Sequence, residues 1–380
     1  MRLKYKSGLR TKLSFLATVL ILIGIILLGC APSGEVPRGW SGVAVSRDTL
    51  FVGSMQGKLL ALNRADSREL WRADLAGTEK APSGAFGCAS APQTVAVYGT
   101  PAVSGETVYV GGYNGKVYAL NAASGAIRWV FPREGKLEGP IVGGLVAASG
   151  NLYFGAADGK VYSLDATTGE RKWAVTTGDK VWATPVVQDN TLFIGSFDQK
   201  LYALNAPDGR KKWEFVTQGA ITATPIVYKN TIYIGSFDRS LYALDITTGN
   251  KKWQFAAESW FWAPPVAYED VIYAPNLDGK LYALRSASGE KLADFNLESP
   301  AASSPVVVGN SVVIASEKGK IFALDTATRQ IRQVADLKEK VDAPLSASEG
   351  VVYIHAQTKD TLYAVRSTGA VLWSFSLSSK

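Results

Sequence analysis

The sequence has 380 residues, of which 47% are hydrophobic and 19% are charged, and its formal net charge is +7. This apolar content excludes a disordered chain, and the length suffices for one large repetitive domain or about two to three ordinary ones. One histidine, His355, and two cysteines, Cys30 and Cys88, are too few for a zinc site, an iron–sulfur cluster or a haem-attachment motif. The many aromatic residues and glycines favour an all-β protein.

The first 29 residues have the pattern of an export signal. Five basic side chains precede a predominantly apolar run without charged residues over residues 13–28. These are the charged and apolar regions of a secretory signal. Residues 1–29 contain no acidic side chain, so their removal lowers the formal charge from +7 to +2. The basic character therefore belongs mainly to the export signal, and the mature protein is close to neutral.

The apolar run ends in Leu-Leu-Gly-Cys, whose last residue is Cys30. This sequence resembles the bacterial lipobox, in which only a thiol can form the thioether to the lipid. We predict that residues 1–29 are a lipoprotein signal peptide, that Cys30 is lipidated and that residues 30–37 form a lipid-anchored tether. An uncleaved transmembrane anchor is the alternative, although the run is short for a span of about 20 residues. Either arrangement predicts an exported protein, anchored in the outer membrane or on the outer face of the cytoplasmic membrane.

Residues 38–380 consist of one motif that recurs eight times. Its clearest copy reads Lys-Leu-Tyr-Ala-Leu-Asn over residues 200–205, followed by a turn and by Lys-Lys-Trp-Glu-Phe over residues 211–215. The spacing is 40 residues from the third copy on, and two earlier intervals of 58 and 44 residues carry insertions. The register also passes through Ala293 and Gln333, where the ring has been lost. The tryptophan of the motif recurs at Trp71, Trp129, Trp173, Trp213, Trp253 and Trp373.

Each copy contains four short runs of alternating apolar residues separated by turn residues, which predicts a four-stranded antiparallel meander. A single meander cannot bury both faces, so the copies must pack against one another. Eight twisted sheets arranged radially form an all-β, eight-bladed β-propeller of four-stranded antiparallel blades. The tryptophan on the outermost strand is then expected to fill the gap between neighbouring blades.

The pattern Asp/Asn-x-x-x-Gly-x-x-x-Trp, seen over residues 165–173, 205–213 and 245–253, resembles the PQQ-like repeat of quinoprotein-type eight-bladed propellers. That family includes pyrroloquinoline-quinone-dependent alcohol dehydrogenases. It also includes non-catalytic lipoproteins similar to BamB, a scaffold subunit of the outer-membrane β-barrel assembly machinery. The resemblance covers nearly the whole mature chain and implies the fold, but it leaves the function open.

The parts that the resemblance implies for a dehydrogenase are missing. Dehydrogenases of the family hold the quinone with a disulfide between adjacent cysteines and a Ca²⁺ bound by Glu, Asn and Asp side chains. The sequence has no adjacent cysteine pair, and once Cys30 is acylated Cys88 has no intramolecular partner. The haem motif of the quinohaem enzymes is also absent. We therefore predict that the protein is not an enzyme and has no catalytic residues, no cofactor and no metal site.

Four aspartates, Asp158, Asp198, Asp238 and Asp278, recur at 40-residue spacing and have the chemistry of Ca²⁺ ligands. Equivalent positions of different blades would lie too far apart to share one ion. We therefore expect each aspartate to bond the backbone of its own tight hairpin. His355 has no accompanying nucleophile motif, so we interpret it as a surface or strand-end histidine rather than a catalytic base.

Loop aromatics form the candidate binding surface. The loops before the innermost strands and the hairpins between second and third strands are expected to meet on one face of a propeller. Neighbouring copies carry small residues at several of these positions, so the fold does not require large rings there. Aromatic rings beside an arginine are typical of protein interfaces. The predicted partner-binding residues are Trp182, Phe197, Phe237, Arg239, Trp260, Phe261 and Trp262. The alternative is that these rings plug the channel or pack between blades.

An inserted segment, Arg72 to Tyr98, interrupts the repeat and contains Cys88, which we expect to be a buried free thiol. We predict a monomeric, non-catalytic propeller that binds envelope or membrane proteins, with a role like that of BamB as the leading case. The alternatives are a quinoprotein dehydrogenase and a carbohydrate- or cell-wall-binding sensor. Nucleic-acid binding is disfavoured by the export signal and the weak mature charge.

Overall fold

The computed structural model describes residues 40–75 and 95–378. The predictions for the signal peptide, for lipidation at Cys30, for the tether and for Cys88 lie outside these residues. The described chain is built of strands joined by turns and loops. Within it, no helix has the length and apolar character needed to cross a membrane.

The strands form eight antiparallel sheets, each made of four strands that are consecutive in the chain. In chain order the blades are β1 (Val43–Ser46), β2 (Thr49–Gly53), β3 (Lys58–Asn63) and β4 (Glu69–Asp74); β5 (Ala102–Ser104), β6 (Thr107–Gly111), β7 (Val117–Asn121) and β8 (Ile127–Phe131); β9 (Val146–Ala148), β10 (Asn151–Ala156), β11 (Lys160–Asp165) and β12 (Arg171–Thr176); β13 (Val186–Gln188), β14 (Thr191–Gly195), β15 (Lys200–Asn205) and β16 (Lys211–Val216); β17 (Ile226–Tyr228), β18 (Thr231–Gly235), β19 (Ser240–Asp245) and β20 (Lys251–Ala256); β21 (Val266–Tyr268), β22 (Val271–Pro275), β23 (Lys280–Arg285) and β24 (Lys291–Asn296); β25 (Val306–Val308), β26 (Ser311–Ala315), β27 (Lys320–Asp325) and β28 (Ile331–Asp336); and β29 (Ser346–Ser348), β30 (Val351–Ala356), β31 (Thr361–Arg366) and β32 (Val371–Ser376).

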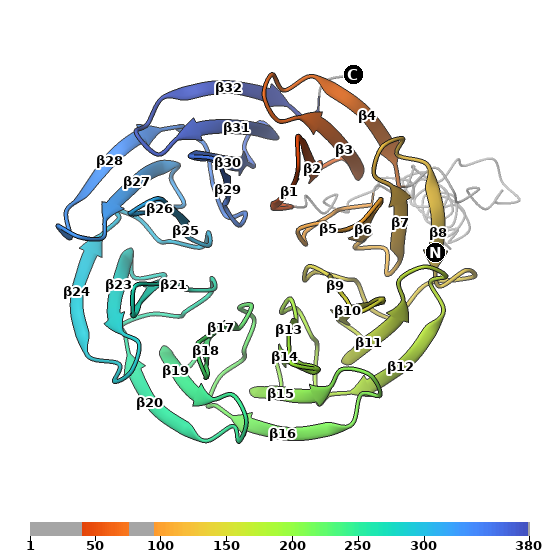
Figure 1. The fold of residues 1–380 in the computed structure, drawn as a ribbon, viewed down its shortest axis with the longest axis horizontal. Coiled ribbons are helices and arrows are strands. Elements are labelled where there is room, and N and C mark those ends of the chain that lie inside the picture. Colours follow the sequence, from red (N-terminus) through yellow and green to blue (C-terminus); the bar gives the residue numbers. More distant parts are fainter. Residues whose placement is uncertain (1–39, 76–94, 379–380) are drawn as a thin grey trace, which may run out of the picture. The chain divides into compact units, whose positions relative to one another are not determined.

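The sheets are arranged as the blades of a ring, with the first strand of each blade toward the centre and the fourth strand at the rim (Figure 1). The predicted eight-bladed β-propeller is therefore confirmed. The inserted segment begins later than predicted, because residues 72–74 belong to strand β4. They pair with β3 and complete the first blade before the chain leaves the repeat.

The hydrophobic core lies between adjacent blades. Second and third strands are almost entirely buried, whereas fourth strands consist mostly of exposed and partly buried residues. Leu201 and Phe193 of the fourth blade, for example, belong to one cluster with Ile232 and Tyr242 of the fifth. Each blade thus buries its faces only against its neighbours, as expected of a repeat architecture.

The structure places the six repeat tryptophans between neighbouring blades. Trp71 Nε1 donates to the carbonyl of Ala122 in the next blade at 2.9 Å. Its ring also packs against Gly125, whose positive φ of 72° and close approach leave no room for a side chain. Corresponding hydrogen bonds to the next blade are made by Trp129, Trp173, Trp253 and Trp373. The ring of Trp213 packs against Gly249.

The seventh blade departs from the predicted register. In each of the six blades that have the repeat tryptophan, this residue pairs with a small residue of the third strand, as Trp213 does with Ala203. In the seventh blade, the bulge lies earlier, so Arg332 pairs with Ala323 and Gln333 pairs with Phe322. The assignment of Gln333 to the tryptophan position from the 40-residue period is therefore wrong. A bulge shifts pairing by one residue without changing the length of the repeat.

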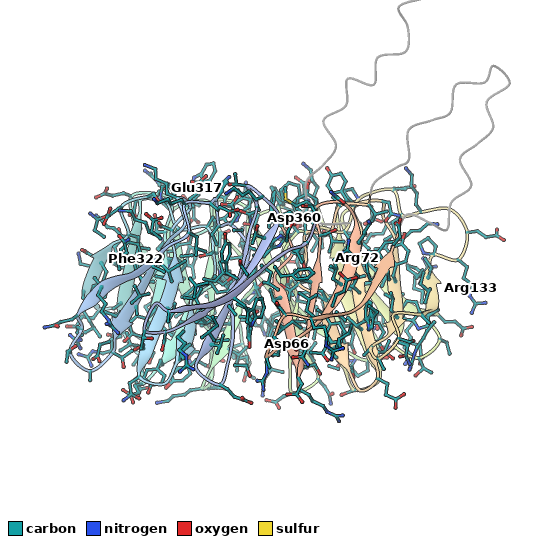
Figure 2. All side chains as sticks on the ribbon, turned by 90° about the horizontal axis from the view of Figure 1, so that it is seen from above. Asp66, Arg72, Arg133, Glu317, Phe322 and Asp360 are labelled. Atoms are coloured by element: carbon teal, nitrogen blue, oxygen red, sulfur yellow. The ribbon has the colours of Figure 1, made fainter. Side chains whose placement is uncertain are left out.

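The propeller has two distinct faces. Figure 2 shows Glu317 and Asp360 on one face and Asp66 on the opposite face. Glu317 and Asp360 lie in turns between second and third strands, whereas Asp66 lies in a turn between a third and a fourth strand. Because neighbouring strands are antiparallel, the loops that lead into the first strands share the face of Glu317 and Asp360. We call this side the hairpin face.

Candidate functional site

Five of the predicted binding residues come together on the hairpin face. Trp182 precedes β13, Phe197 lies in the turn between β14 and β15, and Phe237 lies in the turn between β18 and β19. Trp260 and Trp262 precede β21. These residues are distant in sequence, but the ring places their blades side by side. We call Trp182, Phe197, Phe237, Trp260 and Trp262 the aromatic patch.

Ring contacts run continuously through the aromatic patch. Phe237 stacks on Trp260 with 4.6 Å between ring centroids and 10° between ring planes. It also stacks on Trp262 at 5.6 Å and meets Phe197 edge to face at 6.2 Å. Phe197 in turn contacts Trp182 at 4.7 Å. Phe237 is therefore the central ring, and each contact adds about 0.5–1.5 kcal/mol beyond area burial.

The aromatic patch faces solvent and carries positive charge at its margin. Trp260 is 45% exposed, and the other four rings are partly buried. The Lys180 ammonium lies 5.4 Å from the centre of the Phe197 ring and 5.8 Å from that of Trp182, within cation–π range. Arg239 follows Phe237 in the same turn and is exposed. Exposed rings beside Lys and Arg are suited to binding a protein surface.

Phe261 does not belong to this surface, which corrects its assignment as a binding residue. Its side chain is 1% exposed and packs with Tyr233 and Tyr282 between the fifth and sixth blades. Alternation of side chains along the extended segment separates it from Trp260 and Trp262. The sequence contained a signal for this burial, because the equivalent positions of the other repeats are apolar. In the structure they are all buried, namely Val181, Ile221, Ala301 and Val341.

A cavity of about 220 Å³ opens where the eight loops before the first strands converge. Each blade contributes the residue two positions before the Thr-Pro or equivalent dipeptide that leads into its first strand. These eight residues, in chain order, are Trp40, Tyr98, Val142, Trp182, Thr222, Trp262, Ala302 and Asp342. Sequence reasoning identified only Trp182 and Trp262 as site residues. The 40-residue spacing from 142 to 342 was the signal that could have revealed the others.

The cavity combines aromatic walls with one carboxylate. Trp40 and Tyr98 pack edge to face at 4.5 Å between centroids, and burial raises the pKa of the Tyr98 hydroxyl. Burial also raises the pKa of the Asp342 carboxyl, although Asp342 Oδ2 lies 2.9 Å from Lys340 Nζ. The carboxylate is thus already paired with a neighbouring ammonium group.

The four recurring aspartates bond the backbone of their own turns, as predicted. Asp238 Oδ1 accepts from the backbone N–H of Ser240 at 2.9 Å, and its Oδ2 accepts from the Tyr242 hydroxyl at 2.7 Å. Burial, together with this hydrogen bond, raises the pKa of Tyr242 to about 12. The tyrosine partner was not predicted. Asp158, Asp198 and Asp278 make the same pair of bonds. No group of three or more His, Cys, Asp and Glu side chains that could hold a metal occurs among the described residues.

His355 is completely buried, so of the two predicted positions, surface or strand end, the surface one is wrong. It lies in β30, near the end of the strand, where the eighth blade meets the first. Its Nδ1 is 2.8 Å from the carbonyl oxygen of Ser41, and its Nε2 is 2.9 Å from Asp360 Oδ1. Asp360 Oδ2 also accepts from the backbone N–H of Met55. The histidine therefore links the last blade to the first.

The cavity lining does not match a site for pyrroloquinoline quinone and Ca²⁺. The quinone carries three carboxylates, which require cationic or metal partners. Among the described residues that line the cavity there is no Lys, Arg or Cys, and Asp342 is the single carboxylate. The Lys340 ammonium lies between that carboxylate, at 2.9 Å, and Glu317 Oε1, at 3.1 Å, so it is not free to bind a quinone carboxylate. The remaining lining consists of aromatic and small apolar side chains, hydroxyl groups and backbone atoms.

Comparison with known proteins agrees with this architecture. The sequence matches the family model for outer membrane protein assembly factor BamB over residues 33–87, 83–181 and 157–375. The chain belongs to the BamB family. Among solved structures, BamB from Moraxella catarrhalis superposes with a TM-score of 0.67 at 21% identity, covering 87% of this chain and 92% of that one. The computationally designed Ika8 protein superposes with a TM-score of 0.70 at 19% identity, covering 86% and 95%. No curated protein matches the sequence.

Proposed function

We propose that this member of the BamB family is a non-catalytic scaffold that binds envelope proteins through the aromatic patch. The continuous stack of exposed and partly buried rings around Phe237 is the observation that carries the proposal. Desolvated aromatic clusters flanked by cationic side chains are the common energetic centres of protein interfaces. The family name points to outer-membrane protein assembly as the process in which the scaffold works.

The polar groups of the propeller support a scaffold rather than an enzyme. The four recurring turn aspartates are held by backbone N–H groups and tyrosine hydroxyls. His355 is buried and hydrogen-bonded to Asp360 and to a backbone carbonyl oxygen. Neither bond is to a serine hydroxyl or a cysteine thiol that it could activate as a nucleophile. A catalytic base must reach its substrate, and these groups serve the fold.

We further propose that the protein is exported and membrane-anchored, with the lipid on Cys30. The lipobox-like sequence and the charged and apolar regions before it support this proposal. A lipid anchor would hold the propeller at a membrane surface and raise its effective concentration near membrane partners. Mass spectrometry of the mature N-terminus tests the proposal: a diacylated Cys30 is expected, and an intact residue 1 would overturn it.

Capture of partners from membranes tests the binding surface. Full-length protein would be crosslinked in the cells that produce it and purified, and co-purifying envelope proteins would be identified by mass spectrometry. Phe237→Ala removes the central ring and Trp260→Ala removes the most exposed one. Leu372→Ala is the matched control, because Leu372 is 44% exposed on the rim strand β32. Loss of the same partners in both patch variants, but not in the control, is expected. Unchanged capture in the patch variants would overturn the proposed surface.

The dehydrogenase alternative has its own test. Purified protein would be mixed with pyrroloquinoline quinone, Ca²⁺, an alcohol and a reducible dye. No dye reduction and no shift in the thermal unfolding midpoint are expected, because the cavity lining offers no charge that complements the quinone carboxylates. Dye reduction that depends on both additions would show an enzyme.

A further inference from the structure

Asp342 is the one charged side chain in the described lining of the cavity between the loops that lead into the first strands. We call this space the central cavity. The equivalent residues of the other blades are aromatic, aliphatic or, in one blade, a threonine, so the fold does not require a carboxylate at this repeat position. The Asp342 side chain is 16% exposed, so a bound group can contact it. A partly buried carboxylate costs free energy unless positive charge compensates it.

This compensation is incomplete, because one ammonium group serves two carboxylates. Lys340 Nζ lies 2.9 Å from Asp342 Oδ2 and 3.1 Å from Glu317 Oε1, and Glu317 is on the hairpin face (Figure 2). Neither acid has another ion pair among the described residues. Lys318 and Lys338 line the neighbouring groove without pairing with either of them. A second cation at the central cavity would therefore find a carboxylate that shares its only counter-charge.

The aromatic part of the lining favours a cation as well. The faces of Trp and Tyr rings attract cations, most strongly those of Trp. Trp182 already has the Lys180 ammonium 5.8 Å from its ring centre. No described Lys or Arg lies within that range of the partly exposed rings of Trp40, Tyr98 and Trp262. The cavity volume of about 220 Å³ is far above the ~10–15 Å³ that one water molecule needs, so a whole side chain can enter.

We propose that the central cavity binds an arginine side chain of the envelope protein that docks on the aromatic patch. A guanidinium group is planar, stacks on aromatic rings, pairs with a carboxylate through two N–H groups and is more weakly hydrated than an ammonium group. Trp182 and Trp262 belong to both the patch and the cavity lining, so a protein bound on the patch lies at the cavity mouth. The proposal rests on the proposed scaffold function and specifies the chemistry of its partner.

NMR titration of the full chain in an uncharged detergent tests the site. The probes are the N-acetyl amides of arginine, of lysine and of citrulline, which has nearly the shape of arginine without its charge. The arginine probe is expected to bind, with the citrulline probe at least about fivefold weaker because it loses the charge interactions. The lysine probe and choline, a small quaternary cation, are expected to bind more weakly than arginine. Equal binding of citrulline, or tighter binding of lysine or choline, would overturn the proposal.

Charge variants give effects of opposite sign, measured at pH 8 to favour the ionised form of Asp342. Asp342→Asn is expected to weaken binding of the arginine probe about threefold or more. Lys340→Gln is expected to strengthen it about twofold or more, because the variant removes the competing ammonium group. Trp40→Leu should weaken it about twofold to tenfold. Asp48→Asn is the matched control, because this exposed carboxylate is paired with Arg64 away from the cavity lining. Thermal unfolding checks that every variant is folded.

Wild-type affinity in Asp342→Asn, or weaker binding in Lys340→Gln, would overturn the arginine site. Partner capture separates this failure from that of the scaffold function. Asp342→Arg changes the cavity wall and leaves the five rings of the aromatic patch in place, so capture is expected to fall in this variant and in Phe237→Ala. Capture lost in Phe237→Ala but retained in Asp342→Arg rejects the arginine site alone. Capture retained in both variants rejects the proposed surface and, with it, the source of the arginine.

Discussion

Gly289 lies so close to the indole ring of Trp253 that a Cβ on this glycine would stand 2.6 Å from the Trp253 Cε3 atom. The glycine has a positive φ of 73°. Trp253 Nε1 donates to the carbonyl of Ser286 in the same turn at 2.8 Å. The tryptophan of one blade and the outer turn of the next therefore form a single packed unit. This relationship recurs around the ring, and it explains why the repeat pattern requires glycine at this position.

Replacement of Gly289 by alanine is expected to destabilise the propeller more than the same change at an uncrowded position. The left-handed backbone alone costs roughly 1–2 kcal/mol for a non-glycine residue, and the contact with Trp253 adds to it. Gly309→Ala is the matched control, because Gly309 has a positive φ of 56° and a Cβ added there would meet nothing within 4 Å. Urea unfolding should give a lower midpoint for Gly289→Ala than for Gly309→Ala. Equal midpoints would contradict the role of the indole contact.

Removal of the Trp253 ring is expected to cost about 3–5 kcal/mol, since the side chain is 8% exposed and fills the space between two blades. It also removes the obstacle to a side chain at position 289. The double variant Trp253→Ala/Gly289→Ala is therefore expected to be less destabilised than the sum of the two single variants. A double-mutant cycle by urea unfolding measures this difference, and strict additivity would show that the two residues do not interact energetically.

The tyrosine–aspartate pairs of the hairpin face are expected to make the fold sensitive to alkali. The pKa of Tyr242 is raised to about 12, above its ordinary value of about 10. A raised pKa means that the folded state favours the protonated tyrosine, so its contribution to stability is complete below pH 10 and is lost as the pH rises to about 12. Burial raises the pKa of Tyr162, Tyr202 and Tyr282 in the same direction.

Unfolding midpoints measured from pH 8 to pH 12, together with phenolate absorbance, check this prediction. Stability should fall between about pH 10 and pH 12. Tyr242→Phe should have lower stability at neutral pH, because Asp238 loses a partner, and a smaller loss on going to alkaline pH. The same alkaline loss in wild type and Tyr242→Phe would show that this pair does not contribute to it.

The contact between the eighth and first blades is expected to depend on His355. No strand is shared between these two blades, so side chains must close the ring. His355→Ala removes the bonds to Ser41 and Asp360 and is expected to cost at least about 1–3 kcal/mol. Lys229→Ala, which breaks the exposed ion pair with Asp270, is the control and should cost less than about 1 kcal/mol.

Urea unfolding gives these two costs, and amide hydrogen exchange locates them. Faster exchange confined at first to the strands of the first and eighth blades is expected for His355→Ala. If exchange increases equally in all blades, or if the two variants are equally stable, the histidine does not close the ring.

Several features follow from the sequence because they are local and repeated. The alternation of apolar residues and the turn residues of each copy determine a four-stranded meander, and eight copies determine a closed ring. The aspartates of the tight turns could be interpreted correctly because their backbone bonds join residues two positions apart, as in Asp238 and Ser240. Period alone also placed the tryptophans on the rim strands.

Other features were decided only by the tertiary structure. Which side an aromatic residue faces depends on the neighbouring blade, so Phe261 is buried while Trp260 is exposed. Trp40 and Asp342, from the first and the eighth blade, line the same cavity only because the ring of blades closes. The burial of His355 has the same origin, since its partner Ser41 belongs to the opposite end of the propeller sequence. The repeat determines the strands, turns and packing that all blades share. Closure of the ring brings together the positions at which the blades differ.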